Sequence, residues 1–478
     1  MELRDAAGGT VSEVRYSTGE KASLLEAKGQ RTPLKNGHFP SKILIYLVVL
    51  IFSVTIAAIV GIMFGRYAVP SPSSSAASRS SPQAEICAKP PLLLISLDGF
   101  WAGYLNRSLP LYLQSYIGAT GVIAPYMIPV FPSKTFPNHF SIVTGLYPDV
   151  HGIVDNNFYD SVLEDSFSIG GQTQNDVKWW LGEPVWVTAK KQGLRTAVYF
   201  WPGSEVPIQG IYPDIYFQYS TSTPFAQRVS TVLSWFDFIQ EKRPQFMALY
   251  FNKPDEEGHT YGPFSAQVDE AVGEVDAILQ TLFVGLAERN ISNCVNVMIV
   301  SDHGMAALNS SLFVSFNEVI PSNFTANVSF ESYGVNAQIN VTEGLIDEVF
   351  KGILNNTVTN NLPFTPYKIK DVPSRFQIAK YNPQRYGDIY LLGNLGSYIN
   401  KAGSVSQLGN HGYDNLFSEM QSIFVAHGPA FKQGNYSKPV DSINLYNLMC
   451  ELLKITPSRN NGTSGALDYM LKTLPTAR

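Results

Sequence analysis

Cysteine is scarce in this chain, and its scarcity limits how the fold can be held together. Only three cysteines, Cys87, Cys294 and Cys450, occur among the 478 residues, so at most one internal disulfide can form and one cysteine is left over. A scaffold stabilised mainly by disulfides is therefore excluded. Hydrophobic residues make up 45% of the chain, which is enough to build a core of considerable size.

A strong excess of charge and internal repeats are also missing. The formal net charge is only −5 at pH 7, so the composition gives no indication of a surface that binds polyanions, and we expect no specific nucleic-acid partner. No internal repeat is found. The length of the chain allows two or three ordinary domains, or one large α/β domain with an extension.

One long hydrophobic run lies near the N-terminus. Residues 43–64 carry no charged side chain and match the roughly 20 residues that span a bilayer, which predicts a transmembrane helix. The run begins too far into the chain for a cleaved signal peptide, so we expect a signal anchor. Residues 1–42 are polar and predict a disordered tail, residues 65–90 predict a flexible Ser/Pro-rich stalk, and residues 91–478 predict the folded domain.

Charge and glycosylation motifs predict the orientation of this anchor. More Lys and Arg residues lie shortly before the run than shortly after it, which places the N-terminus in the cytoplasm. Every Asn-x-Ser/Thr motif follows the run, which agrees with that orientation. We therefore predict a single-pass type II membrane protein whose folded domain is extracellular or lumenal, at the cell surface or on the secretory or vacuolar route. The predicted glycosylation sites are Asn106, Asn290, Asn309, Asn323, Asn327, Asn340, Asn355, Asn435 and Asn461.

From Pro91 onward, short β-branched or aromatic runs alternate with helical patterns. Several of the runs are apolar throughout, as in strands that are buried on both faces. This alternation predicts an α/β fold with a mostly parallel sheet flanked by helices. The polar residues 306–370 predict a small insertion. The predicted strands are 92–97, 195–200, 246–251, 296–301, 389–392 and 422–426, and the helical patterns include 229–236 and 268–282.

Thr135 lies in the stretch FPSKTFPNHFSIVTG, residues 131–145. The apolar spacing after Pro137 predicts a short helix with proline in its first turn. The Thr135 hydroxyl would then lie at a helix N-terminus, where backbone N–H groups favour an oxyanion. For an isolated Thr-x-Pro sequence, a plain helix cap would be the simpler interpretation.

Carboxylates and imidazoles follow three of the predicted strands, and one more imidazole lies in the sequence Gly-Asn-His-Gly. The carboxyl ends of strands in an open α/β sheet form the crevice where ligands bind, so these side chains should meet at one edge. Nitrogen and oxygen donors without a thiolate favour catalytic zinc, and the set is large enough for two ions. The residues are Asp98, Asp255, His259, Asp302, His303 and His411.

Several ordered stretches resemble the nucleotide pyrophosphatase/phosphodiesterase family of the alkaline phosphatase superfamily. They are LLLISLDGF, FPSKTFPNHFSIVTGLYPDVHGIVDN, WVTAKKQGLRTAVYFWPGSE, KPDEEGHTYGP, VMIVSDHGM and GNHGYDN, within residues 91–455. The resemblance implies an alkaline-phosphatase-like core. It also implies a two-zinc hydrolase that acts on nucleoside triphosphates, dinucleotides and other phosphodiesters, and here it would be a membrane-anchored member without the C-terminal nuclease-like domain of longer members.

The resemblance also implies a role for each site residue. One zinc would be held by Asp98, Asp302, His303 and the Thr135 oxygen, and the other by Asp255, His259 and His411. Thr135 would attack phosphorus and form a covalent nucleotidyl-threonine, since coordination to zinc would activate its hydroxyl. Asn156 would bind the non-bridging phosphate oxygens. His139 and His151 are interpreted as structural.

A nucleoside pocket is implied next to this centre. Phe136 and Tyr219 match the aromatic pair that holds a base in the family, and such stacking tolerates different bases. Trp201 and Glu205 resemble the rest of the pocket, although many relatives have Asp at the position of Glu205. Base preference therefore stays open.

Two other functions remain as alternatives. The same metal pair could serve a choline-type or lysophospholipid phosphodiesterase, whose head-group pocket would replace the aromatic pair. A catalytically silent surface receptor is the alternative from another class, and the intact set of ligand residues argues against it. A sulfatase is disfavoured because no cysteine occupies the nucleophile position.

Overall fold

The computed structural model describes residues 81–472, apart from residues 108, 110 and 402–404. The predicted tail at 1–42, the predicted transmembrane helix at 43–64 and the greater part of the predicted stalk lie outside the described residues. In the described part of the chain, no helix is both long and apolar enough to cross a bilayer.

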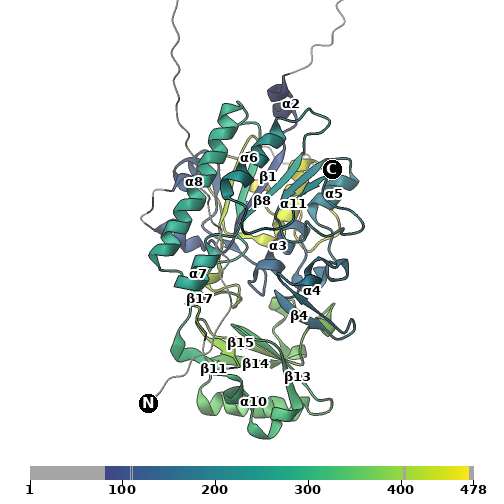
Figure 1. Cartoon of the computed structure of the whole chain (residues 1–478), viewed down its shortest axis with the longest axis vertical. Helices are drawn as coiled ribbons and strands as arrows, with labels where there is room; N and C mark the ends of the chain where they lie inside the picture. Colours follow the sequence, from purple (N-terminus) through teal and green to yellow (C-terminus); the bar gives the residue numbers. More distant parts are fainter. Residues whose placement is uncertain (1–80, 108, 110, 402–404, 473–478) are drawn as a thin grey trace, which may run out of the picture. The chain divides into compact units, whose positions relative to one another are not determined.

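An eight-stranded sheet forms the centre of the larger lobe (Figure 1). Its strands run parallel, except that β18 is antiparallel to both of its neighbours. The sheet is therefore mixed but mostly parallel, as the alternating pattern predicts. In spatial order the strands are β19 (Asn435–Tyr436), β2 (Val122–Ile123), β18 (Phe424–His427), β9 (Asn296–Val300), β1 (Leu92–Leu97), β8 (Phe246–Phe251), β6 (Thr196–Tyr199) and β7 (Ile215–Tyr216).

Helices cover both faces of this sheet (Figure 1). In β1, Leu92 and Leu94 enter one hydrophobic cluster, whereas Leu93 and Ile95 enter the other. Burial on both faces explains why the central runs are apolar throughout. The first cluster is completed by α3 (Thr135–Thr144), α5 (Val185–Lys191) and α11 (Leu445–Leu453), and the second by α6 (Phe225–Phe236) and α8 (Ala266–Glu288).

A smaller lobe follows β9 in the sequence and lies below the sheet in Figure 1. It is a four-stranded antiparallel sheet packed on one helix, with a hydrophobic cluster of its own. The residues of the predicted insertion, 306–370, supply most of this lobe, and the lobe extends beyond them to about residue 400. Its elements are β12 (Val328–Ser332), β13 (Asn336–Val341), α10 (Ile346–Asn360), β14 (Phe364–Lys368) and β15 (Ile389–Gly393), in the sheet order β12-β13-β15-β14.

The strand predicted at 389–392 belongs to this smaller sheet and not to the central one. Ile389 and Leu391 enter the smaller lobe's cluster, while Tyr390 packs with Phe131 and Phe376 on the other face. Both faces of β15 are buried, so its local pattern is the same as that of a central strand. The other predicted strands lie in the central sheet, although the one predicted at 422–426 is β18 and runs antiparallel.

The predicted stalk ends earlier than expected. Pro82–Ala88 forms helix α2, with Ser81 as its N-cap and Pro at the start of its first turn, and its Ile86 is buried. Cys87 forms a disulfide with Cys294, and Cys450 is a buried free cysteine. The prediction of a flexible stalk up to residue 90 is therefore wrong from residue 82 onward, because a capped helix and a disulfide attach this segment to the domain.

Candidate active site

Three neighbouring strands deliver carboxylates to one edge of the central sheet. Asp98 follows β1 directly, Asp302 follows β9, and Asp255 begins helix α7 (Asp255–Tyr261) after β8. Because β8, β1 and β9 are adjacent and parallel, their carboxyl ends lie side by side. The carboxylates that were predicted to meet at one edge of the sheet therefore do lie together there. His411 joins it just after β17 (Gly409–Asn410), which pairs with β10 (Ala306–Ala307) beyond His303.

Thr135 is the first residue of α3, as the sequence predicts. Its Oγ1 lies 3.2 Å from His303 Nε2, so the hydroxyl faces the group of carboxylates and imidazoles. The side-chain oxygen of Asn156 accepts the Phe136 backbone N–H at 2.9 Å. This bond orients the Asn156 amide, and its NH₂ group has no protein acceptor among the described residues. A donor is therefore available beside the Thr135 hydroxyl.

The three histidines of the site share one tautomer. Each presents Nδ1 to a backbone carbonyl: His303 to Gly304 at 2.9 Å, His259 to Gly409 at 3.0 Å and His411 to Ser133 at 2.8 Å. A carbonyl only accepts hydrogen bonds, so Nδ1 carries the proton and Nε2 presents a lone pair. The Nε2 atoms of His259 and His411 lie 3.1 Å apart. Two lone pairs that face each other in this way fit a shared cation.

The carboxylates complete three potential metal-binding groups. In each group the ligand atoms lie within 4.8 Å of one another. The groups are Asp255 with His259 and His411, Asp98 with Asp255 and His303, and Asp98 with His139 and Asp302. Buried oxygens of Asp98, Asp255 and Asp302 also accept no hydrogen bond within the described residues. Buried polar atoms are rarely left without a partner, so this donor set fits bound cations.

The charges at this edge are not balanced by the protein itself. Burial, with Asp302 and Asp255 close by, raises the pKa of Asp98 well above its ordinary value. Burial opposes ionisation of Asp302 as well, but His303 and His139 hold its pKa well below the usual range. Burial together with His303 and His259 lowers the pKa of His411, which keeps this imidazole neutral and able to bind a metal.

Two further residues support the site. His139 lies one helical turn after Thr135, and its Nδ1 is 2.8 Å from the Thr135 carbonyl and 3.3 Å from Asp302 Oδ2. The Tyr250 hydroxyl donates to Asp98 Oδ2 at 2.6 Å. His139 was predicted from the sequence to be structural, and Tyr250 was not among the predicted site residues. The spacing of four residues between Thr135 and His139 was a usable signal for the first, whereas nothing local indicated the second.

A cavity of about 750 Å³ opens beside the metal-type residues. Its lining brings together most of the predicted substrate-binding and ligand residues. Tyr219 is 42% exposed, whereas Phe136 and Trp201 are buried walls. Glu205 accepts the backbone N–H of Tyr219 at 2.6 Å. This hydrogen bond holds the backbone that carries the Tyr219 ring. The predicted residues in the lining are Asp98, Thr135, Phe136, Trp201, Glu205, Tyr219, Asp255 and His259.

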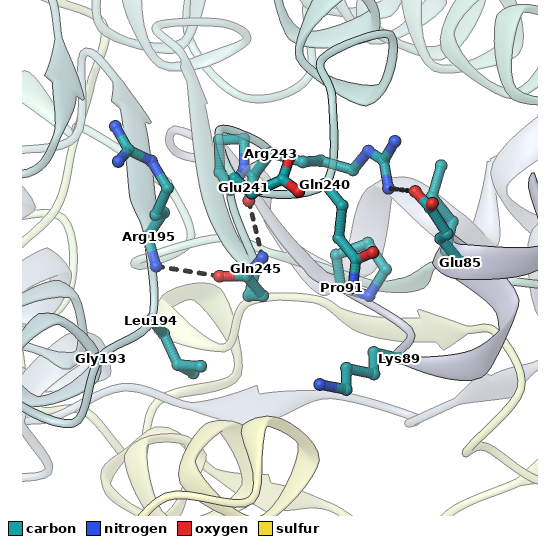
Figure 2. A pocket seen from close by; sticks show the side chains of 12 residues that line it. Glu85, Lys89, Pro91, Gly193, Leu194, Arg195, Gln240, Glu241, Arg243 and Gln245 are labelled. Atoms are coloured by element: carbon teal, nitrogen blue, oxygen red, sulfur yellow. Dashed lines mark hydrogen bonds and ion pairs between the residues drawn. The ribbon is translucent and has the colours of Figure 1, made fainter. Parts of the chain in front are cut away.

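A second cavity, of about 410 Å³, lies at the opposite ends of the same strands (Figure 2). Gln245 accepts the Arg195 backbone N–H at 2.9 Å, and the Arg243 guanidinium lies 3.4 Å from Glu85. No predicted site residue lines this cavity, and none of its lining side chains is left buried without a partner. Of these two cavities, the first is therefore the one that combines an open volume with buried polar atoms that lack a hydrogen-bond partner.

Comparison with known proteins agrees with this geometry. Residues 92–414 match the model of the family described as type I phosphodiesterase / nucleotide pyrophosphatase. The chain is 40% identical over 396 residues to ectonucleotide pyrophosphatase/phosphodiesterase family member 3 of Bos taurus, covering 80% of this chain and 44% of the relative. It is 42% identical over 392 residues to venom phosphodiesterase 2 of Crotalus adamanteus, covering 80% of this chain and 47% of that protein. The chain thus spans about half the length of these curated relatives.

Solved structures show the same fold. An inactive variant of murine ectonucleotide pyrophosphatase / phosphodiesterase 5 in complex with AMP has a TM-score of 0.74 and 32% identity, covering 80% of this chain and 100% of that one. The human counterpart has a TM-score of 0.75 and 33% identity, with the same coverage. Together with the matched family model and the assembled edge of carboxylates and imidazoles, these similarities show that the chain belongs to the type I phosphodiesterase/nucleotide pyrophosphatase family.

Proposed function

We propose that this chain hydrolyses nucleotide pyrophosphate and 5′-phosphodiester bonds, and that it converts nucleoside triphosphates to monophosphates and pyrophosphate. One observation carries the proposal. A threonine hydroxyl at a helix N-terminus lies among carboxylates and imidazoles, and it opens into a cavity with an aromatic lining. The names of the relatives and the AMP bound to a structural neighbour support a nucleotide as the substrate.

The cofactor in this proposal is a pair of zinc ions. Asp98, Asp302, His303 and Thr135 would hold one, and Asp255, His259 and His411 the other. The donors are nitrogen and oxygen atoms without a thiolate, which suits catalytic zinc. When bound, such ions supply Lewis acidity and neutralise charge on phosphate oxygens.

The residues of the chain then carry the reaction. Thr135 Oγ attacks phosphorus, the bond from phosphorus to the leaving oxygen breaks, and a covalent nucleotidyl-threonine forms. Asn156 donates its NH₂ group to a non-bridging oxygen, and the N-terminus of α3 favours the same negative charge. Water then cleaves the phosphorus–threonine bond and releases the nucleoside monophosphate. The aromatic pair Phe136 and Tyr219 holds the base by stacking, which is worth about 1–3 kcal/mol.

The predicted placement in a membrane is also kept as a proposal. The disulfide between Cys87 and Cys294 supports an oxidising compartment for the folded domain. Most of the predicted glycosylation sites are exposed as well, which would leave room for a glycan. The exposed ones are Asn106, Asn290, Asn309, Asn323, Asn355 and Asn461.

Product analysis of the full-length chain tests the proposal. The protein would be incubated with zinc and ATP, or with lysophosphatidylcholine, next to the Thr135→Ala variant. AMP and pyrophosphate that disappear in the variant are the expected result. Phosphocholine or choline without AMP would move the function to lipid head groups, and no product from either substrate would favour a silent receptor.

A further inference from the structure

Arg228 is a buried arginine behind the aromatic wall of the active-site cavity. It lies on α6 and has an exposed fraction of 0%. The pKa of this guanidinium is lowered by burial and raised by the phenols of Tyr219, Tyr250 and Tyr199, and no carboxylate is among the described groups that act on it. A buried cation without a carboxylate is less favourable than an apolar side chain of similar size. Packing alone therefore does not explain this residue.

The guanidinium connects two segments that form the cavity. Its Nε donates to the Thr223 carbonyl at 3.2 Å, and its Nη1 donates to the Tyr250 carbonyl at 2.9 Å. Thr223 lies in the segment between β7 and α6, which also carries Tyr219. Tyr250 lies in β8 and donates its hydroxyl to Asp98. Arg228 therefore attaches the Tyr219 segment to a strand that leads into the metal-type edge.

Aromatic rings surround the same guanidinium. Its central carbon lies 4.8 Å from the ring centre of Phe225, 5.0 Å from that of Phe200 and 5.9 Å from that of Phe251. These distances are within the range of cation–π attraction, which is stronger where water is excluded. The Nη2 atom has no hydrogen-bond partner within the described residues, so contacts with ring faces supply the remaining stabilisation of the cation.

Phe200 connects Arg228 to the cavity. Its backbone has a φ of +69°, in the left-handed region that a bulky residue rarely adopts, so surrounding contacts must hold it in place. The ring of Phe200 lines the cavity and meets the Tyr219 ring edge to face, with centres 5.2 Å apart. The Tyr219 ring meets Tyr250 in the same way at 6.0 Å. Two aromatic neighbours of Tyr219 therefore contact Arg228 themselves.

We propose that Arg228 is a positioning residue for the base-stacking pair, and that it makes the enzyme prefer phosphodiesters that carry a nucleoside. This inference rests on the proposed function. Arg228 is not part of the cavity lining, so it acts through Tyr219. A base loses less affinity to the ordering of the Tyr219 segment when Arg228 already holds that segment. The described hydrogen bonds and ring contacts of Arg228 involve neither Thr135 nor the proposed zinc ligands, so its effect should appear in KM more than in kcat.

Two phosphodiesters with the same leaving group test the proposal in the full-length chain. The p-nitrophenyl ester of thymidine 5′-monophosphate carries a base, methyl p-nitrophenyl phosphate carries none, and both release p-nitrophenolate. We expect Arg228→Met to lower kcat/KM for the nucleoside ester by about 20-fold, mainly through KM, because most of the stacking with the base is lost. For the methyl ester the loss should be less than about 3-fold. Arg228→Lys keeps the charge but cannot bond both carbonyls, so a loss of about 5-fold with the nucleoside ester is expected.

A double variant separates positioning from a general loss of structure. Tyr219→Ala removes the ring through which Arg228 is proposed to act. Arg228→Met added to Tyr219→Ala should therefore change kcat/KM for the nucleoside ester by less than about 2-fold. The matched control is Arg243→Met, which also removes a buried guanidinium that donates to two carbonyls, but at the amino ends of the strands. It should lower kcat/KM for neither ester.

Equal losses with the two esters, or the full 20-fold loss in the Tyr219→Ala background, would overturn the proposal and leave Arg228 as a residue of the fold alone. If Arg228→Met does not fold, Arg228→Lys carries the same comparison, and an unchanged preference for the nucleoside ester would overturn the proposal. A wild-type protein that hydrolyses neither ester would instead refute the proposed function itself.

Discussion

The two ends of the central sheet contain cavities of opposite character. At the carboxyl ends of β1 and β8, buried oxygens of Asp98 and Asp255 have no hydrogen-bond partner in the described structure. At the amino ends, the buried Arg243 donates to two backbone carbonyls and pairs with Glu85 (Figure 2). At the amino ends of these strands the lining polar groups have hydrogen-bond partners. At the carboxyl ends several buried oxygens have none, so a ligand could supply them. The difference teaches that unsatisfied buried donors and acceptors, rather than a cavity alone, mark the reactive site.

The largest effect on activity is expected for Thr135, the proposed nucleophile at the carboxyl ends of the strands. Thr135→Ala should lower kcat/KM for ATP by at least about 10⁴-fold, because it removes the hydroxyl that contacts His303 Nε2 in the described site. Zinc content and melting temperature should stay close to those of wild type, since three of the four residues proposed to hold that ion would remain. Metal analysis and calorimetry beside the kinetic assay check this pattern. Activity within tenfold of wild type would exclude Thr135 as the nucleophile.

Asp255→Asn should separate activity from stability. We expect about a 10³-fold loss of kcat and loss of bound zinc, because Asp255 contributes to two of the potential metal groups. Without metal, however, the variant should be more stable than wild type by about 1 kcal/mol, since Asp255 is one of the charges that oppose ionisation of Asp98. Denaturant unfolding in the presence of a chelator measures this difference.

The matched control for Asp255→Asn is Glu241→Gln, which neutralises an exposed carboxylate that lines the opposite cavity. It should change neither activity nor metal-free stability. A metal-free Asp255→Asn protein that is less stable than wild type would show that Asp255 supports the fold and would weaken the contrast between the two ends.

At the amino ends of the strands, Arg243→Met should lower stability without changing activity. Arg243 is 5% exposed and donates to the carbonyls of Phe236 and Phe238 at 3.1 and 2.7 Å. Its removal takes a charge-assisted hydrogen bond from each of these carbonyls and one ion pair from Glu85, so we expect the free energy of unfolding to fall by about 3 kcal/mol. The kcat with ATP should not change. Arg195→Met, which removes an exposed guanidinium at the same cavity, should cost less than about 0.5 kcal/mol.

The sequence predicted the carboxyl ends of the central strands, where the site lies, better than the rest of the molecule. Asp98, Asp255 and Asp302 could be placed together because each follows a recognisable buried strand, and strand ends of a parallel sheet must meet. Tyr250 escaped notice because it lies inside β8, where burial and not sequence position decides which side chains reach the site. The helix at Pro82–Ala88 was missed because its Ser and Pro residues also suit a linker, and only the tertiary contact of Ile86 and the disulfide distinguish the two.

The smaller lobe shows the same limit for β15. Its apolar run predicts a strand correctly, but membership of a sheet depends on long-range pairing with β13 and β14, which no local pattern encodes. The roles of the histidines at the site were also predicted only in part. His303 and His411 were predicted as ligands from their neighbours, whereas the contact of His139 with Asp302 depends on how α3 packs against the end of β9.

His151 provides the smallest test, because it is a buried histidine with satisfied hydrogen bonds and not a member of the metal-type groups. Its Nε2 is 2.9 Å from Ser141 Oγ and 3.1 Å from the Pro137 carbonyl. Burial lowers the pKa of His151 to about 3. The unfolded chain titrates near pH 6.5, so below that pH it binds a proton that the folded state does not.

Stability contributed by His151 is therefore complete above pH 6.5 and is lost as the pH falls toward 3. At pH 5 the loss should be about 2 kcal/mol. Unfolding free energies of wild type and His151→Gln would be measured at pH 7 and pH 5, both in chelator, so that release of metal does not contribute. The difference between the two pH values should shrink by about 2 kcal/mol in the variant. If the difference between pH 7 and pH 5 is the same in wild type and variant, the acid sensitivity comes from the histidines predicted to bind metal. Titration would then not distinguish His151 from those histidines.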